Sequence, residues 1–214
     1  MGKYTCNKEV FKTIETEEEA YWLGFILADG CNVNNQMIRV DIKDANHLEK
    51  LSDLIYNGEK PIQIRDLGFG PVYCFHCGVL DVVHNLNEHG VVPRKSKIVK
   101  LPVIKDDMYR HFIRGLFDGD GCLTYTMDKN YRRYNFSIVG NQELIMGVRD
   151  ILLKEVPVYV GHGKMKMIYR LNVRGNQQIM TLLDWLYQGS KIHLDRKFDK
   201  FQEMLYHYRE KNNK

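Results

Sequence analysis

The stretch His111-Phe-Ile-Arg-Gly-Leu-Phe-Asp-Gly-Asp-Gly121 decides the fold, because the stretch Tyr21-Trp-Leu-Gly-Phe-Ile-Leu-Ala-Asp-Gly30 repeats it. Aligned without gaps, the two stretches match at Gly24 and Gly115, Ala28 and Gly119, Asp29 and Asp120, and Gly30 and Gly121. The same spacing at every pair indicates that the chain is duplicated.

Each copy carries the signals of a helix. Thr16 followed by Glu19 predicts a capping box at the start of the first helix. Asp106 and Asp107 place negative charge at the start of the second, where the helix dipole favours it. Both helices are expected to end at glycine, in the left-handed C-terminal cap for which glycine is best suited.

Small residues recur on one face of both predicted helices. Gly24 and Ala28, like Gly115 and Gly119, are four positions apart and so lie on the same helical face. Glycine inside a helix costs about 1 kcal/mol relative to alanine, so its recurrence suggests a reason. Small residues allow two backbones to approach closely. We therefore expect the two helices to pack against each other.

Close packing would bring Asp29 and Asp120 together at the ends of the two helices. Carboxylates at helix C-termini oppose the helix dipole, and two of them repel each other. A divalent cation would offset both effects. Asp118 has no such partner, because Leu27 takes its place in the first copy. The alternative, two aspartates in solvated turns, is favoured for one copy alone but not for the pair.

Residues 22–30 (WLGFILADG) and 113–121 (IRGLFDGDG) resemble the two motifs of LAGLIDADG homing endonucleases of the single-chain, two-motif (pseudo-dimeric) type. The resemblance implies that the motif helices form the interface between two similar halves. It also implies that Asp29 and Asp120 bind metal and are catalytic. The cofactor expected from the resemblance is Mg²⁺; Mn²⁺ is expected to substitute, and Ca²⁺ to bind without supporting efficient cleavage.

The resemblance extends to residues around the two acids. It implies that the backbone carbonyls of Ala28 and Gly119 are metal ligands and that a basic catalytic residue lies beside each acid. Lys95 and Lys197 are the matches for that residue, since Arg94-Lys95 and Arg196-Lys197 correspond in the two halves.

The composition of the 214 residues is that of an ordinary globular protein, with 44% hydrophobic and 27% charged residues. A net charge of +4 permits nucleic-acid binding without requiring it. We expect no signal peptide and no membrane association, because no apolar stretch is long enough to span a bilayer. Five cysteines do not suggest a disulfide framework. The expected location is intracellular, wherever the target DNA lies: a bacterial or phage-infected cytoplasm, or an organelle.

Two other metal sites are disfavoured. Cys74, His76 and Cys77 could belong to a zinc site, but a structural zinc ion needs four ligands and no second pair has suitable spacing. A calcium-binding EF-hand loop starting at Asp118 would need glycine at Leu123 and glutamate at Lys129. Alternating strand residues explain the cysteines better.

The order of predicted elements is the same in both halves. In the first, the motif helix is followed by a hairpin (31–44) turning at Asn34-Asn35, a helix (45–56), a hairpin (61–78) with Ile62 and Ile64 inward, and a helix (79–89). In the second, the corresponding segments are 122–140, 141–156, 158–175 and 176–187. The predicted fold is α+β, with two similar αββαββα halves, each holding a four-stranded antiparallel sheet.

The predicted domains are an N-terminal half (1–92), a basic linker (93–105), a C-terminal half (106–192) and a C-terminal helix or tail (193–214). The linker carries four basic residues and no acid between 91 and 102, and a simple solvated connection is an equally good interpretation of it.

The predicted strands alternate between apolar and polar residues, so each sheet would have one polar face. Arginine recognises guanine, asparagine or glutamine recognises adenine, and lysine neutralises phosphate, so such a face suits DNA. The alternative is an ordinary sheet with one solvated side. The expected DNA-binding residues are Asn32, Asn34, Gln36, Arg39, Asp41, Lys43, Gln63, Arg65, Thr124, Thr126, Arg133, Asn135, Ser137, Lys164, Lys166, Arg170, Asn172 and Arg174.

Together these observations predict a sequence-specific endonuclease that cuts both strands of a long double-stranded DNA site by Mg²⁺-dependent phosphodiester hydrolysis. It would act as a monomer with no obligate protein partner, because both halves lie in one chain. The alternative is a non-cleaving nucleic-acid-binding protein on the same fold, either an intron maturase or a transcription factor.

Overall fold

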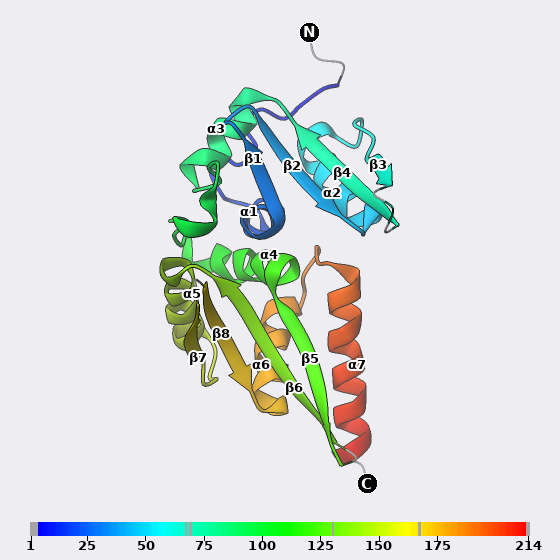
Figure 1. The fold of residues 1–214 in the computed structure, drawn as a ribbon, viewed down its shortest axis with the longest axis vertical. Helices are drawn as coiled ribbons and strands as arrows, with labels where there is room; N and C mark the ends of the chain where they lie inside the picture. Colours follow the sequence, from blue (N-terminus) through cyan, green and yellow to red (C-terminus); the bar gives the residue numbers. More distant parts are fainter. Residues whose placement is uncertain (1–3, 67, 69, 130, 167, 213–214) are drawn as a thin grey trace.

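A computed structural model describes residues 4–66, 68, 70–129, 131–166 and 168–212. It has the predicted α+β fold, with two four-stranded antiparallel sheets in two similar halves stacked along the long axis (Figure 1). The N-terminal half comprises α1 (Glu17–Asp29), β1 (Gly30–Val33), β2 (Met37–Ile42), α2 (Ala45–Tyr56), β3 (Gln63–Asp66), β4 (Pro71–Cys77) and α3 (Leu80–Glu88). The C-terminal half comprises α4 (Tyr109–Asp120), β5 (Cys122–Asp128), β6 (Tyr131–Gly140), α5 (Gln142–Glu155), β7 (Gly161–Met165), β8 (Ile168–Arg174) and α6 (Asn176–Tyr187), followed by α7 (Asp195–Asn212). Short 3-10 helices η1 (Lys95–Lys97) and η2 (Asp106–Met108) lie between the halves.

The motif helices are α1 and α4, and their N-terminal ends are built differently. The predicted capping box is present at α1: the Thr16 hydroxyl accepts from the Glu19 amide, and the Glu19 carboxylate accepts from the Thr16 amide. The acids Asp106 and Asp107 lie in η2, one turn before α4 begins at Tyr109. They extend the start of the second motif helix by a 3-10 turn.

The predicted left-handed caps at Gly30 and Gly121 are wrong. Their φ angles are −79° and −75°, which any residue can adopt. Space requires glycine there: a Cβ on Gly30 would lie 2.6 Å from the Ile26 side chain, and one on Gly121 would lie 2.1 Å from that of Phe117. The chain turns directly from each helix into a strand, so it folds back over the last helical turn.

The two motif helices pack against each other as predicted, through the small residues. A Cβ on Gly24 would lie 2.0 Å from the carbonyl oxygen of Phe112, and a Cβ on Gly115 would lie 1.9 Å from that of Tyr21. Both obstacles are backbone atoms, which cannot rotate away. Glycine in the middle of each helix is therefore what allows the helices to touch.

Replacing Gly115 by alanine should destabilise the protein by about 1–3 kcal/mol, because the two helices must separate to admit the methyl group. Thermal unfolding followed by circular dichroism measures the effect. Gly163→Ala is the matched control, since Gly163 lies in β7 with nothing within 4 Å of its Cβ position. Equal stability of the two variants would contradict the close helix contact.

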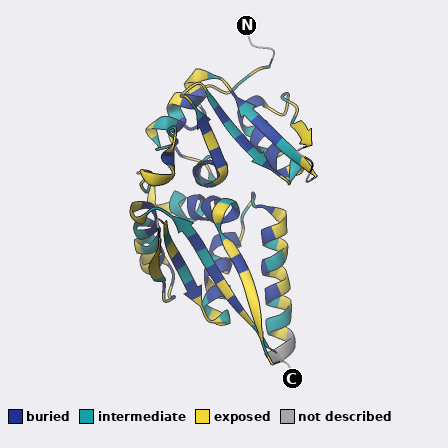
Figure 2. Cartoon of the chain, viewed as in Figure 1, coloured by how far each residue is buried: buried dark blue, intermediate teal, exposed yellow. Residues whose placement is uncertain are grey.

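The strand orders are β1-β2-β4-β3 and β5-β6-β8-β7. Helices α2 and α3 contact the first sheet, and α5 and α6 contact the second. The core lies between the sheets and these helices, where Figure 2 shows buried positions alternating with exposed ones along the strands. The opposite face of each sheet, here called its open face, carries no helix in the part of the chain that the structure describes (Figure 1). The predicted Asn34-Asn35 turn is present, with φ of 53° and 59°.

Two expectations about burial need correction. Ile64, expected to be inward, lies on the edge strand β3 and is 67% exposed, because it lines an open hollow between that strand and α2. The basic segment between the halves is not simply solvated, since Lys95 is buried with only 7% of its surface exposed.

Among the described residues, no helix is both long and apolar enough to cross a membrane.

Candidate functional site

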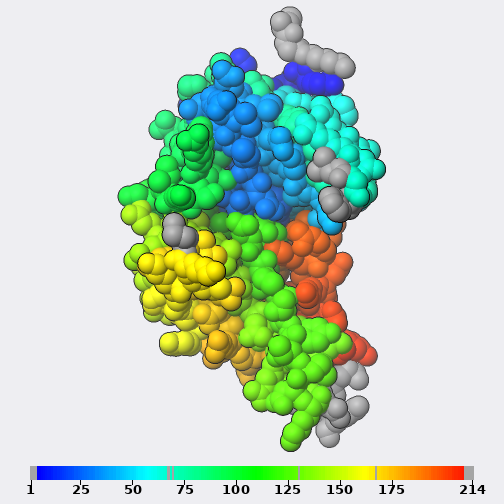
Figure 3. All heavy atoms as spheres, viewed as in Figure 1, coloured from blue at the N-terminus to red at the C-terminus, as the bar shows by residue number. Residues whose placement is uncertain are grey.

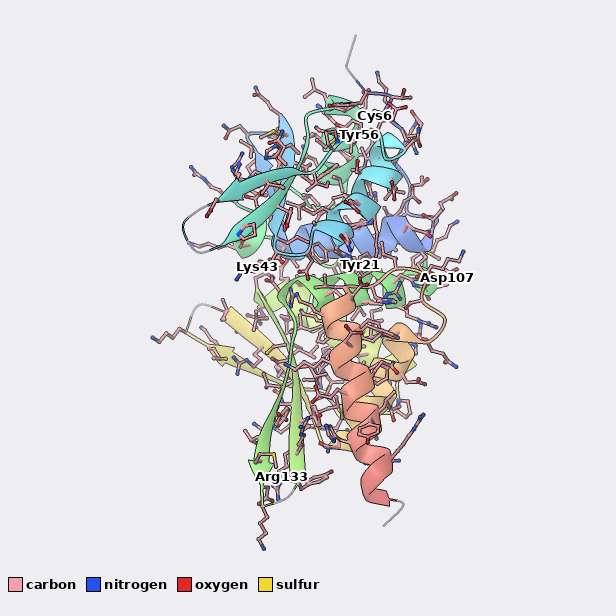
Figure 4. The ribbon with its side chains drawn as sticks, turned by 90° about the vertical axis from the view of Figure 1, so that its right-hand side faces the viewer. Cys6, Tyr21, Lys43, Tyr56, Asp107 and Arg133 are labelled. Atoms are coloured by element: carbon pink, nitrogen blue, oxygen red, sulfur yellow. The ribbon has the colours of Figure 1, made fainter. Side chains whose placement is uncertain are left out.

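Asp29 and Asp120 are the last residues of α1 and α4, and their side chains reach solvent. The ends of the two helices are in contact there: a Cβ on Gly119 would lie 2.4 Å from the Cβ of Ala28 and 3.6 Å from the amide nitrogen of Asp29. The predicted pair of acids is thus brought together where the two halves meet. Figure 4 shows Tyr21, from the middle of α1, at the same interface.

Burial destabilises the charged form of both carboxylates. Partial burial by the packed helix ends raises the pKa of both, and the Asp29 charge raises the pKa of Asp120 further. Lys95 and Lys197 act in the opposite direction and lower both pKa values. A divalent cation bound beside both acids would stabilise their charged form further.

Both predicted lysines lie at these helix ends. The Lys95 Nζ donates to the carbonyl oxygen of Gly30. The Lys197 Nζ donates to the carbonyl oxygens of Phe117 at 2.5 Å, Gly119 at 3.3 Å and Gly121 at 2.6 Å. Burial lowers the pKa of Lys95, and it lowers the pKa of Lys197 to about 8. Each acid thus has a buried ammonium group nearby.

The donor set suits a hard divalent cation. Carboxylate and carbonyl oxygens are ligands of Mg²⁺, which usually keeps water and substrate phosphates as further ligands. Asp29, Asp120 and the carbonyls of Ala28 and Gly119 could hold it, although the Gly119 carbonyl also accepts from Lys197. In the described part of the chain, no group of three or more His, Cys, Asp and Glu side chains could hold a metal. Water and DNA would have to complete the coordination.

Magnesium should raise the melting temperature of the protein alone. At a concentration ten times the dissociation constant, bound Mg²⁺ would add about 1.4 kcal/mol of stability, or roughly 3–6 °C. The Asp29→Asn and Asp120→Asn variants should lose most of this shift. Differential scanning fluorimetry with sodium chloride at matched ionic strength is the measurement, and an equal magnesium shift in all three proteins would argue against this metal site.

Asp118 is not part of this pair. It is fully buried, and its carboxylate accepts from the Tyr21 hydroxyl at 2.8 Å, the Tyr187 hydroxyl at 2.6 Å and the Leu194 amide at 2.8 Å. Leu194 directly precedes α7, which carries Lys197. Asp118 therefore holds α1, α6 and the start of α7 together, so its role is structural.

Strand register places most predicted DNA-binding residues on the open faces, because paired residues point to the same side. In the second sheet, Ser137 pairs with Asn172, and Phe136 with Val173 on the buried side. In the first sheet, Arg39 pairs with His76 on the open face. The predicted residues on open faces are Arg39, Asp41, Gln63, Arg65, Thr124, Thr126, Arg133, Asn135, Ser137, Arg170, Asn172 and Arg174.

The prediction for Asn32 is wrong. Asn32 pairs with Ile38 on the buried side, and its amide donates to the carbonyl oxygen of Val91 at 2.7 Å. It ties β1 to the segment after α3 instead of facing solvent. The first strand starts immediately at Gly30, which fixes the alternation that turns Asn32 inward.

Lys164 is also misplaced, because it pairs with Tyr169 and so lies on the helix side at the edge strand β7. The prediction extended the even-numbered alternation of β8 across the hairpin. The pairing of Met165 with Ile168 reverses it, so Gly163, not Lys164, lies opposite Arg170.

Four further predicted residues lie beside the strands instead of within them. Lys166 occupies the β7–β8 turn with φ of 51°, and Asn34 and Gln36 belong to the β1–β2 turn. Lys43 follows the end of β2 and is exposed. In Figure 4, Lys43 lies close to the level of the motif helices, and Arg133 lies at the far end of the C-terminal half.

Three residues near the acids were not predicted as site residues. Cys31 and Cys122, exposed on the open faces, directly follow the two motif glycines. Arg196 lowers the pKa of Asp29, and its Nε donates to Asp44 at 3.1 Å. The duplication could have indicated the cysteines, since they occupy matching positions. Arg196 also has a match in the duplication, Arg94, but its place near Asp29 depends on how α7 packs.

No family model and no curated protein matches the sequence. Solved structures do match the fold. Full-length DUF199/WhiA from Thermatoga maritima matches over 94% of this chain, with a TM-score of 0.58 and 18% identity; this chain spans 65% of that one. The meganuclease I-SmaMI bound to uncleaveable DNA matches with a TM-score of 0.61 and 11% identity, covering 87% of this chain and 88% of that one.

A third structure, the LAGLIDADG meganuclease I-AabMI bound to uncleaved DNA, matches with a TM-score of 0.57 and 13% identity, again over 87% and 88% of the two chains. At these identities the likeness concerns architecture alone. The chain therefore shares the fold of LAGLIDADG proteins, a group of structures that includes both meganucleases and WhiA.

Proposed function

We propose that this protein is a sequence-specific DNA endonuclease that makes a double-strand break by Mg²⁺-dependent hydrolysis. The observation that carries the proposal is the pair Asp29 and Asp120, held at touching helix ends, each near a buried lysine. The pair lies where the two halves meet; in Figure 3 these are the blue to cyan upper half and the green to red lower half, and the open face of each sheet carries the polar residues named above. One chain holds both halves, so it would act as a monomer.

Asp29, Asp120 and the carbonyls of Ala28 and Gly119 would hold the metal. Bound Mg²⁺ supplies Lewis acidity and lowers the pKa of water beside a phosphodiester. Lys95 and Lys197 would add positive charge near the scissile phosphates. Burial lowers the pKa of Lys197 to about 8, so its ammonium group still carries most of its charge near neutral pH, and its Nζ donates to three carbonyl oxygens.

The open faces would lie along the DNA. A two-stranded antiparallel ribbon fits the major groove, and side chains that alternate along it can contact base edges. Arg133, Asn135 and Ser137 follow one another along β6 on the same face. The arginine side chain suits the edge of guanine, and the asparagine side chain suits the edge of adenine. The protein would act wherever its target DNA lies.

A second candidate function is DNA binding without cleavage, as a maturase or transcription factor. The observation that favours it is the match to WhiA, whose identity to this chain is higher than that of the two meganucleases. Both acids and both lysines are nevertheless present, which a protein that only binds would not need.

A plasmid assay separates the two functions. The probe is a supercoiled plasmid that carries the protein's own insertion locus with the intervening element removed. The proposal predicts linear product with Mg²⁺ and none with EDTA, and next-generation sequencing of the ends locates the cut. Retention of the plasmid in a gel shift, with neither nicking nor linearisation in Mg²⁺ or Mn²⁺, would favour the second function.

A further inference from the structure

The open faces of the two sheets differ in how much of their positive charge is free. On the first, Arg39 is held by Asp41, two residues along the same strand. The Arg39 Nε lies 2.7 Å and its Nη2 2.5 Å from one Asp41 oxygen. The guanidinium is thus largely neutralised by its own sheet, and Arg65 remains as the other arginine of this face.

On the second open face, Arg170 and Arg174 have no such partner. Both lie on β8, and among the described residues neither forms an ion pair. Arg133 differs, since it pairs with Asp128 near the tip of the hairpin. Arg174 and Asn135 are direct cross-strand neighbours, and they line the same hollow of about 460 Å³. Free guanidinium and amide groups therefore lie side by side here.

The second sheet is also longer. Its strand β6 has 10 residues, whereas the corresponding β2 has 6. At about 3.3 Å per residue these strands span about 33 Å and 20 Å. Base pairs are stacked about 3.4 Å apart, so the strands could follow about ten and six base pairs. The colours of Figure 1 show the β5–β6 hairpin extending to the lower end of the molecule.

We infer that the C-terminal sheet supplies most of the DNA affinity and contacts a longer half-site than the N-terminal sheet. The two halves share a fold but contribute unequally to DNA affinity. Arg170 and Arg174 of the C-terminal sheet can displace DNA counterions directly, whereas Arg39 of the N-terminal sheet must first leave its ion pair with Asp41. This inference rests on the DNA-binding part of the proposed function and does not depend on cleavage.

Salt dependence of binding to a labelled, mixed-sequence DNA duplex tests the inference, with two matched double variants. Each phosphate contact contributes about 0.9 to the slope of log K against log salt. R170A/R174A should reduce the magnitude of the slope by about 1.8, and R39A/R65A by about 0.9 or less. Fluorescence anisotropy in a potassium chloride series gives both slopes, and circular dichroism verifies that each variant is folded.

Asp41→Asn provides a second test that does not remove a basic residue. Releasing Arg39 should strengthen binding and steepen the slope by up to about 0.9. Equal slope losses in the two double variants, or a larger loss in R39A/R65A, would overturn the unequal division while leaving DNA binding intact. Unchanged binding by Asp41→Asn would count against it as well. Failure of the unaltered protein to bind duplex DNA would overturn the proposed function together with the inference.

Discussion

Asp29→Asn and Asp120→Asn should each lower the rate of double-strand cleavage by about a thousandfold or more, while DNA binding stays close to that of the unaltered protein. Asparagine keeps the shape of the side chain but removes the charge that a divalent cation requires. A bound metal ion lowers the free energy of the charged transition state by several kcal/mol, and each 1.4 kcal/mol corresponds to a factor of ten in rate. The measurement is linearisation of supercoiled target plasmid under single-turnover conditions.

The same experiment separates loss of chemistry from loss of binding. Affinity is measured in Ca²⁺, which we expect to bind without supporting cleavage. Asp184→Asn, an exposed acid on α6, is the matched control and should cut normally. The metal-free Asp120→Asn protein should be at least as stable as the parent, since the repulsion from Asp29 is removed. Full cleavage by both active-site variants would exclude the proposed role of the pair.

Asp118→Ala should have the largest effect on stability, about 3 kcal/mol or more. The substitution leaves the Tyr187 hydroxyl and the Leu194 amide without their acceptor in a fully buried site, and each unsatisfied group costs about 1–3 kcal/mol. Tyr21 loses one of two partners and keeps His47 at 2.9 Å. The alanine also leaves a cavity between α4 and α6.

Urea unfolding of Asp118→Ala and Asp120→Ala provides a matched pair, because the two acids are two positions apart on one helix. Asp120 is exposed at the helix C-terminus, where its charge opposes the dipole, so its removal should change stability by about 0.5 kcal/mol or less. Similar losses for the two variants would mean that Asp118 is not the structural acid that its contacts indicate.

The duplication in the sequence was enough to predict the two packed motif helices, the two sheets and the pair of acids. The four-residue spacing of Gly24 with Ala28, repeated by Gly115 with Gly119, was enough to predict the close helix contact, because small residues avoid a clash with a facing backbone. Local alternation predicted the strands and the polar faces of β6 and β8, because side chains in a strand point alternately to opposite sides. Asp29 and Asp120 followed from the same comparison.

Tertiary structure decided what local pattern could not. Whether Lys164 faces the open side depends on the register of the β7–β8 hairpin, and Asn32 turns inward because β1 begins directly at Gly30. The burial of Lys95 and Lys197 against helix ends joins segments more than 60 residues apart in the sequence. Sequence by itself thus determined the duplicated helices and the acids they carry. Only packing between distant segments decided that Lys95 and Lys197, which the resemblance had indicated, are buried beside those acids and that Arg196 lies near them as well, because burial and charge proximity depend on neighbours in space.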